Sequence, residues 1–161
     1  MSDKPLAPAP TAPNGFSAVV LSNSYEKVHY ALLLASAAAA IGKPSVLFFS
    51  MGACRTLAAQ RNEAQAAGNN LDAPGWHDLA AEPRFLDALD QDTQYKARGI
   101  ADMETLLSAC AALGTRFIVC ETGLRSIDLA EDALRADLPI EVAGAVTWLT
   151  ESPVGATTLL A

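Results

Sequence analysis

The chain has 161 residues and a formal net charge of −7, with 51% hydrophobic and 18% charged residues. This length suits one domain, because a chain of about 150 residues can bury about 70% of the surface that its unfolded form exposes. Only 11 residues are Lys or Arg, and they are spread along the chain. A cationic surface that could neutralise a nucleic-acid backbone is therefore not expected, and we predict no nucleic-acid partner.

The first residues, Met1 to Pro13, are mostly Pro and Ala and lack the apolar segment of a secretory signal. We expect residues 1–14 to form a disordered tail and residues 15–161 to form a single domain. The most apolar stretch, Ala31 to Ile41, is shorter than the roughly 20 residues of a membrane-crossing helix, so no stable membrane insertion is predicted. The three cysteines show neither metal-ligand spacing nor a disulfide framework. These features predict a cytoplasmic protein with reduced thiols, no metal and no cofactor.

Short apolar runs alternate with helical patterns along the domain. Strands are predicted at 16–22, 45–50, 116–119, 138–144 and 156–160. Helices are predicted at about 25–41, 51–59, 101–113, 126–136 and 145–150, the first with a capping box of Asn23 and Glu26. Between about 60 and 100 the periodicity is lost at Gly and Pro, which indicates a lid-like insertion. The alternation predicts a three-layer α/β/α sandwich with a mainly parallel five-stranded sheet in flavodoxin-like order.

Cys120 ends the third predicted strand and comes directly before a predicted helix start. Open α/β sheets bind ligands at the carboxyl ends of their strands, and backbone N–H groups at the start of a helix stabilise a thiolate. Cys120 is therefore the candidate catalytic residue, with Arg125 favouring its charged form, Gly123 permitting a tight turn and Glu121 opposing ionisation. The alternative is a cysteine buried as a small apolar residue.

Further candidate binding residues follow the first two predicted strands. Cys54 and Arg55 follow the second strand, whereas Ser22, Asn23 and Ser24 follow the first. If the strand order is 2-1-3, the ends of the second and third strands are about 9–10 Å apart. This distance is too long for a disulfide between Cys54 and Cys120. The alternatives are that Cys54 is packed inside the core and that the three polar residues only cap the following helix.

Other chemically distinctive residues have mainly structural interpretations. Cys110 lies among leucines on a predicted helix, and His29 could be a proton donor but fits a packed histidine better. Trp76, Phe85 and Tyr95 give the insertion an apolar part that could cover the strand ends or, as we favour, pack against another subunit. Together with the Ala-rich helices, they predict a homo-oligomer.

Several segments resemble the DsrE/DsrF-like sulfur-relay family, over nearly all of the chain after the tail. They span 20–35, 41–53, 110–120 and 140–149. The resemblance implies an oligomer of the same α/β sandwich, with sulfur carried as a persulfide on Cys120. It also matches Cys110 to a second cysteine of one branch, but that branch often continues with a Met-Ser-Met-like run where this chain has Glu-Thr-Gly-Leu. The segment from Cys120 to Arg125 also locally resembles the active loop of rhodaneses.

These features together favour a cytoplasmic sulfurtransferase-like protein that carries sulfur as a persulfide on Cys120. Its expected partners are a sulfur donor or acceptor protein, or a small thiol. The alternatives are a non-catalytic module that binds a small molecule or a protein, and a subunit of a larger complex on the same fold.

Overall fold

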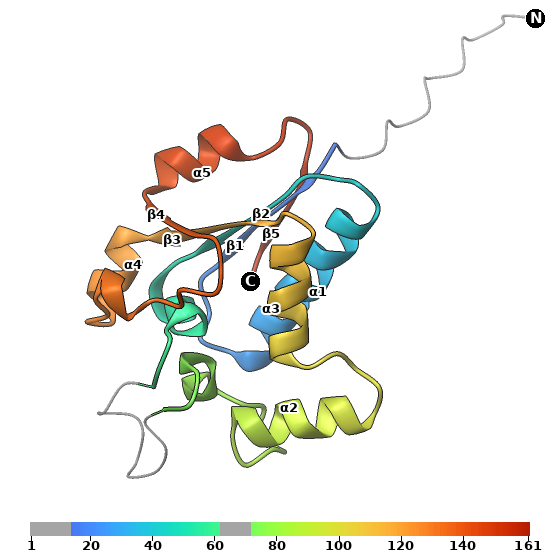
Figure 1. Cartoon of the computed structure of the whole chain (residues 1–161), viewed down its shortest axis with the longest axis vertical. Helices are drawn as coiled ribbons and strands as arrows, with labels where there is room; N and C mark the ends of the chain where they lie inside the picture. Colours follow the sequence, from blue (N-terminus) through green and yellow to red (C-terminus); the bar gives the residue numbers. More distant parts are fainter. Residues whose placement is uncertain (1–13, 62–71) are drawn as a thin grey trace, which may run out of the picture.

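The computed structural model describes residues 14–61 and 72–161. The predicted disordered tail and part of the predicted insertion therefore lie outside the described residues. A five-stranded parallel sheet forms the centre of the described part, in the order β4-β3-β2-β1-β5 (Figure 1). The strands are β1 (Phe16–Val20), β2 (Ser45–Phe49), β3 (Arg116–Cys120), β4 (Ile140–Ala143) and β5 (Thr157–Leu160). The predicted three-layer α/β fold with a parallel sheet is confirmed.

The neighbours of β2 differ from the 2-1-3 arrangement that we assumed when placing Cys54. Residues Val46–Phe49 of β2 pair directly with Arg116–Val119 of β3, and β1 pairs with β2 and β5. Hydrophobic periodicity identifies strands and crossover helices, but it does not specify on which side of a strand the next one is added. As a consequence, the carboxyl ends of β2 and β3 lie side by side.

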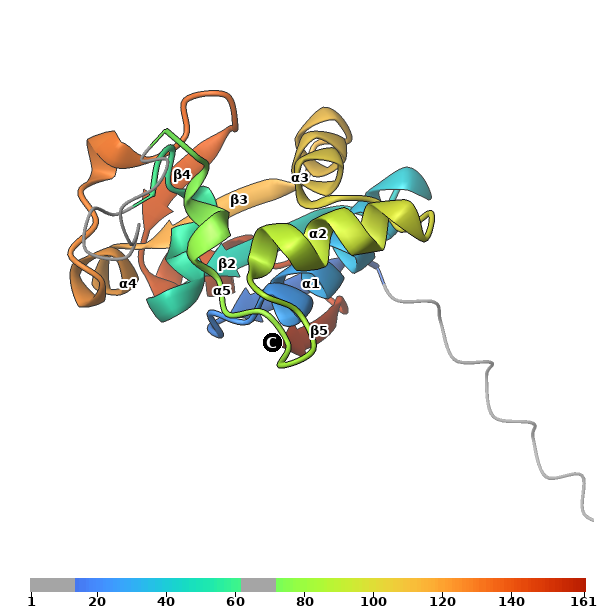
Figure 2. The ribbon, with the colours of Figure 1, turned by 90° about the horizontal axis from the view of Figure 1, so that it is seen from below.

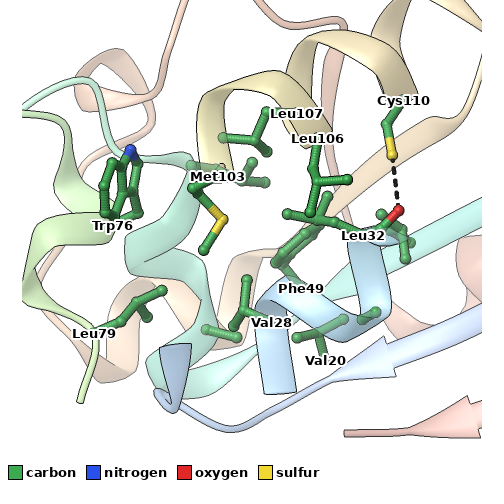
Figure 3. Close-up of a cluster of buried hydrophobic side chains, with 14 of the residues drawn as sticks. Val20, Val28, Leu32, Phe49, Trp76, Leu79, Met103, Leu106, Leu107 and Cys110 are labelled. Carbon is green, nitrogen blue, oxygen red and sulfur yellow. Dashed lines mark hydrogen bonds between the residues drawn. The ribbon is translucent and has the colours of Figure 1, made fainter. Parts of the chain in front are cut away.

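The larger core lies on the sheet face covered by α1 (Tyr25–Ala40) and α3 (Met103–Ala112), with α2 (Ala88–Ala97) beyond them (Figures 1 and 2). Figure 3 shows side chains from both helices and the sheet converging there. Asp87 and Asp102 begin α2 and α3 by accepting hydrogen bonds from backbone N–H groups three residues later. In contrast, α1 begins after Ser24 without a side-chain cap, so the predicted capping box at Asn23 is wrong.

The opposite sheet face carries a thinner layer formed by α5 (Ala145–Glu151). Trp148 of α5 stacks on Phe48 with ring centroids 5.8 Å apart, and its indole N–H donates to Ser17 Oγ at 2.9 Å. The outward side of α5 leaves Val146 and Leu149 exposed. This helix therefore covers the face through one aromatic contact rather than through a wide apolar surface.

Two predicted helices differ from the observed structure. The segment after β2 is a 3₁₀ helix, η1 (Met51–Leu57), that starts with Met51 at a φ of 50°. After β3, α4 (Glu121–Ser126) begins at once and ends before Asp128, whose φ is 52°. The predicted helix at 126–136 is wrong, since only a 3₁₀ turn, η3 (Glu131–Ala133), occurs there. A residue at positive φ interrupts an α-helix.

The described part of the insertion packs against its own chain. It contains η2 (Gly75–Asp78) and α2, and its side chains Trp76, Phe85 and Tyr95 are buried. Trp76 and Tyr95 contact the ring of Tyr25 on α1, with centroids 6.1 and 5.8 Å apart. The expectation that these aromatic residues pack against another subunit is therefore wrong. No helix of residues 14–61 and 72–161 is both long and apolar enough to cross a bilayer.

Candidate functional site

The parallel strands place their carboxyl ends at one edge of the sheet, where several predicted site residues meet. Cys120 is the last residue of β3 and pairs in register with Ala143, the last residue of β4. On its other side, the backbone N–H of Ser50 after β2 donates to the Val20 carbonyl at 2.9 Å. This edge is therefore built from the ends of four neighbouring strands, as expected for a ligand site in an open α/β sheet.

Cys120 directs its side chain to the α5 face of the sheet. There it belongs to the smaller apolar cluster, with Phe48, Ile118 and Ala143 among its members, and 8% of its surface is exposed. Cys120 is also the N-cap residue of α4, but its sulfur accepts no hydrogen bond from the first turn of that helix. Cys120 thus lies at the predicted junction between strand and helix, buried in apolar surroundings but with a small part of the residue exposed.

Gly123 is required for close packing rather than for a turn. It lies inside α4 and is buried, so residues 121–126 form a helix and not the rhodanese-like loop suggested by the sequence. A Cβ at this position would lie 2.6 Å from the Met51 backbone nitrogen and 2.8 Å from the Cys54 sulfur. The missing side chain therefore allows α4 to dock against η1, which sets the direction in which the chain leaves Cys120.

Cys54 lies beneath α4, close to the candidate thiol. It is fully buried, and its Sγ donates to the Phe49 carbonyl at 3.6 Å. Burial, together with the negative charge of a Cys120 thiolate, raises the pKa of the Cys54 thiol to about 12, although nearby backbone N–H groups act to lower it. The predicted separation by a whole strand is wrong, because β2 and β3 are neighbours. Cys54 is held as a protonated thiol next to Cys120.

Cys110 has the structural role that its helical surroundings predict. It is fully buried between α3 and α1, and its Sγ donates to the Leu32 carbonyl at 3.3 Å (Figure 3). Burial raises the pKa of its thiol to about 11. Two of the three thiols of the chain are thus sealed in the core.

The polar residues after β1 shape the strand edge. Ser22 Oγ accepts a hydrogen bond from the Ser24 backbone N–H at 3.1 Å. Asn23 is exposed, its carbonyl accepts from the Ala80 N–H at 2.7 Å, and its Cβ would lie 2.8 Å from a Cβ built on Gly52. These contacts tie the end of β1 to the insertion and to η1, so the three residues have local structural roles at the edge where they were predicted.

The two predicted arginines lie apart from the thiol. Arg125 is exposed in the last turn of α4, at the opposite end of the helix from Cys120. Arg55 is half-buried and lines a narrow hollow together with Asp78 and Ile127. An exposed guanidinium is strongly screened by water, so Arg125 can exert only a weak effect on the thiol.

Met51 is a residue of this edge that the sequence did not indicate. It is exposed directly after β2 and has a φ of 50°, a conformation that is uncommon for a residue with an unbranched side chain. Its backbone nitrogen lies against Gly123 of α4. Glycine is the residue that most readily adopts a positive φ, so the sequence would have assigned this conformation to Gly52 rather than to Met51.

A second set of polar residues that the sequence did not predict lies beneath the insertion. Tyr25 Oη donates to Asp92 Oδ1 at 2.6 Å, and the same oxygen accepts from the Met103 N–H at 2.7 Å. His29 is buried beside them, with Nε2 at 2.7 Å from the Ala101 carbonyl, which confirms the interpretation of a packed histidine. These groups connect α1 to the segment between α2 and α3, and their hydrogen bonds are internal.

The chemistry available at the strand edge is that of one thiol. Within the described ranges, no three His, Cys, Asp or Glu side chains are grouped so that they could hold a metal ion. A thiolate at Cys120 is a nucleophile without a metal or a general base. No protein-family model matches the chain, and no curated protein matches it in sequence.

Proposed function

We propose that the protein is a sulfur carrier of the DsrE/DsrF-like type, which holds one sulfur atom as a persulfide on Cys120. The observation that carries this proposal is the difference between the three thiols. Cys54 and Cys110 are fully buried, and burial raises their pKa values to about 12 and 11. Cys120 alone keeps some exposed surface, and it does so at the carboxyl edge of the sheet.

The proposed reaction is an exchange of one sulfur atom between thiols. The Cys120 thiolate attacks the outer sulfur of a donor persulfide, the donor's S–S bond breaks, and the donor leaves as a thiolate that takes up a proton from water. A thiolate of the acceptor then attacks the outer sulfur on Cys120 and restores the Cys120 thiolate. The two steps balance without an external oxidant or reductant, so no cofactor is needed.

The donor and the acceptor approach Cys120 along the strand edge. Glu121 and Thr122 at the start of α4 are exposed, and so are Gly144 and Ala145 at the start of α5. The exposed residues on the β4 side are small, and the apolar cluster around Cys120 limits access of water to the sulfur. The proposed partner is a protein or a small thiol that brings its sulfur to this edge. Ser22 and Asn23 lie after β1 and would contact the flank of such a partner.

Intact-mass measurement after incubation with glutathione persulfide tests the proposal. We expect the wild type and the Cys110→Ala variant to gain one sulfur atom that dithiothreitol removes, and the Cys120→Ser variant to gain none. Circular dichroism of Cys120→Ser establishes that it folds. A wild type that retains no sulfur, or a Cys120→Ser protein that retains as much as the wild type, would overturn the proposal.

A non-catalytic binding module is the second candidate, and the burial of Cys120 among Phe48, Ile118 and Ala143 favours it. In that case the sulfur is a packing group. The rate of Cys120 alkylation in the native state separates the two functions. A carrier requires Cys120 to react faster than it would through global unfolding, whereas a packed thiol reacts only when the protein unfolds.

A further inference from the structure

The outer edge of β5 carries backbone groups that are directed away from the sheet. The N–H groups of Thr157 and Ala161 donate to the carbonyls of Gly15 and Val19 next to β1. Because alternate residues of a strand direct their backbone groups to opposite sides, Thr158 and Leu160 direct theirs outward. The segment Thr157–Leu160 contains neither Pro nor a charged residue. It therefore lacks the features that commonly keep an edge strand from pairing.

Two open hollows lie side by side along this edge, between β5 and α1. The first, of about 410 Å³, is lined by Tyr30 and by residues 159–161, with Glu26 and Lys27 at its rim. The second, of about 300 Å³, is lined by Leu34, Ala38, Ile41 and Lys43 of the α1 side and by Thr157. Figure 2 shows α1 and β5 next to each other at this edge of the molecule. Tyr30, Ile41 and Leu160 are exposed here, so apolar side chains are exposed on this surface between the charged residues at its ends.

We propose that two copies of this chain associate through this surface, with β5 pairing antiparallel to β5 of the second copy. The pairing would join the two sheets into one continuous sheet and place the two α1 helices side by side. This inference goes beyond the proposed sulfur chemistry and does not depend on it. It assigns the homo-oligomer expected from the sequence to one surface of the fold.

A two-fold axis at Leu159 satisfies the outward backbone groups of both strands. Thr158 then lies opposite Leu160 of the second copy and Leu160 opposite Thr158, and each pair exchanges two backbone hydrogen bonds. Leu159 faces Leu159 of the second copy in a pair without backbone hydrogen bonds. A surface that pairs with itself in this way is what a symmetric dimer requires.

The same axis brings the hollows of the two copies together. It places the first hollow of one copy against the second hollow of the other, so that Tyr30 meets Leu34 and the apolar side of α1. The two α1 helices run antiparallel, and antiparallel helix dipoles attract each other. Glu26 at one end is brought toward Lys43 at the other end of the second copy, once on each side of the axis. The self-complementary backbone groups of β5 and the opposite charges of Glu26 and Lys43 favour a second copy as the occupant.

Other occupants fit this edge less well. The tail has prolines at positions 5, 8, 10 and 13, and a proline has no N–H to donate to a strand ladder. Val146 and Leu149 on α5 are also exposed, but α5 covers the face of the sheet opposite to α1. They provide a matched control.

Molar mass measured by analytical ultracentrifugation over a range of concentrations tests the interface. We expect the wild type to be a dimer, and Leu160→Pro and Tyr30→Glu to weaken dimerisation by at least about tenfold. Leu160→Pro removes an N–H that makes no hydrogen bond to β1, and Tyr30 is exposed, so both variants should keep the wild-type circular dichroism. Leu149→Glu, on α5, should remain dimeric. A wild type that is monomeric throughout, or a dimer that both edge variants retain, would overturn the proposal.

Two further measurements test the register. Residues paired without backbone hydrogen bonds in antiparallel strands have Cα atoms about 4.5 Å apart, which a disulfide can span. Leu159→Cys in a Cys120→Ser background should therefore form a covalent dimer on oxidation, and Val146→Cys should not. Glu26→Lys and Lys43→Glu should each weaken the dimer, and the double variant should restore it.

Failure of both the crosslink and the charge exchange would contradict the antiparallel register. A chain that dimerises only after residues 1–13 are removed would show that the tail occupies the edge, and this too would overturn the proposal. Because none of these measurements uses a persulfide, their failure leaves the proposed function unaffected.

Discussion

Gly123 lies so close to Cys54 that a Cβ at position 123 would be 2.8 Å from the Cys54 sulfur. Gly123 is in the middle of α4, which directly follows Cys120, and Cys54 is in η1, which follows β2. The contact therefore joins the segments that leave two neighbouring strands. It is this packing that determines where the candidate thiol is held relative to the strand edge.

Gly123→Ala should destabilise the protein by about 1–3 kcal/mol, because the added methyl group overpacks a contact between two backbone segments. Replacing Cys54 by Ala in the same protein should recover only part of the loss, since the Met51 nitrogen would remain 2.6 Å from the new Cβ. Urea unfolding measures both effects. Gly144→Ala is the control, because nothing lies within 4 Å of its Cβ. An equal loss in both Ala variants would contradict the assigned role of Gly123.

The buried thiols should make the protein less stable in alkaline solution. Burial raises the pKa values of Cys54 and Cys110 to about 12 and 11 in the folded state, whereas an unfolded cysteine has a pKa of about 8.5. The contribution of these thiols to the free energy of unfolding is fully present below pH 8.5. It is lost as the pH rises toward the pKa values of the folded state, by up to about 1.4 kcal/mol per pH unit for each thiol. The free energy of unfolding measured between pH 8 and pH 10.5 should fall less steeply in Cys110→Ala. Parallel curves for both proteins would show that Cys110 ionises normally in the folded state.

Tyr25→Phe should destabilise the protein by about 1–3 kcal/mol. The substitution leaves the buried Asp92 Oδ1 with the Met103 N–H but without the tyrosine hydroxyl, and an incompletely satisfied buried carboxylate is costly. Chemical denaturation monitored by circular dichroism measures the change. The exposed Tyr30 offers the matched substitution Tyr30→Phe, which should change stability by less than about 0.5 kcal/mol. If the two variants are equally stable, the Tyr25 hydrogen bond contributes nothing to folding.

Arg135 should stabilise the fold through Glu104 at neutral pH and lose this effect in acid. Its guanidinium binds both Glu104 oxygens at 2.7 and 2.8 Å, and Trp76 Nε1 donates to the same carboxylate at 2.7 Å. Burial alone would raise the pKa of Glu104, but these hydrogen bonds outweigh it, and the pKa is lowered. A lowered folded pKa means that the stabilisation is present above the unfolded value of about 4.3 and is lost as the pH falls through the folded one.

Arg135→Ala should therefore cost about 1 kcal/mol at pH 7 and less at pH 3, where Glu104 takes up protons. Unfolding followed by tryptophan fluorescence at the two pH values gives the comparison. Arg98→Ala removes an exposed arginine whose guanidinium donates to the side-chain oxygen of Gln94, and it should have a small effect on stability at both pH values. A loss for Arg135→Ala that does not depend on pH would point to packing rather than to the carboxylate.

Local sequence patterns determined the class of fold and the position of the thiol in it. The run Arg116–Cys120 is a strand because apolar residues fill both of its faces, and the residues after it form a helix, so Cys120 falls at a strand end whatever the order of the sheet. The three-layer architecture follows from alternating strands and helices in the same way. Likewise, the leucines around Cys110 identified a buried helical face.

Only the tertiary structure decided which strands are neighbours. Helical crossovers of similar length can add the next strand on either side, so no local pattern places β2 beside β3, and the contact of Cys54 with Gly123 depends on that choice. The burial of Trp76 and Tyr95 against α1 likewise depends on contacts between residues that are far apart in sequence. The free edge of β5 is a property of the assembled sheet, because the same four residues in a central strand would have both sides paired. Periodicity reports which face of an element is buried, and the packing of all elements together determines what buries it.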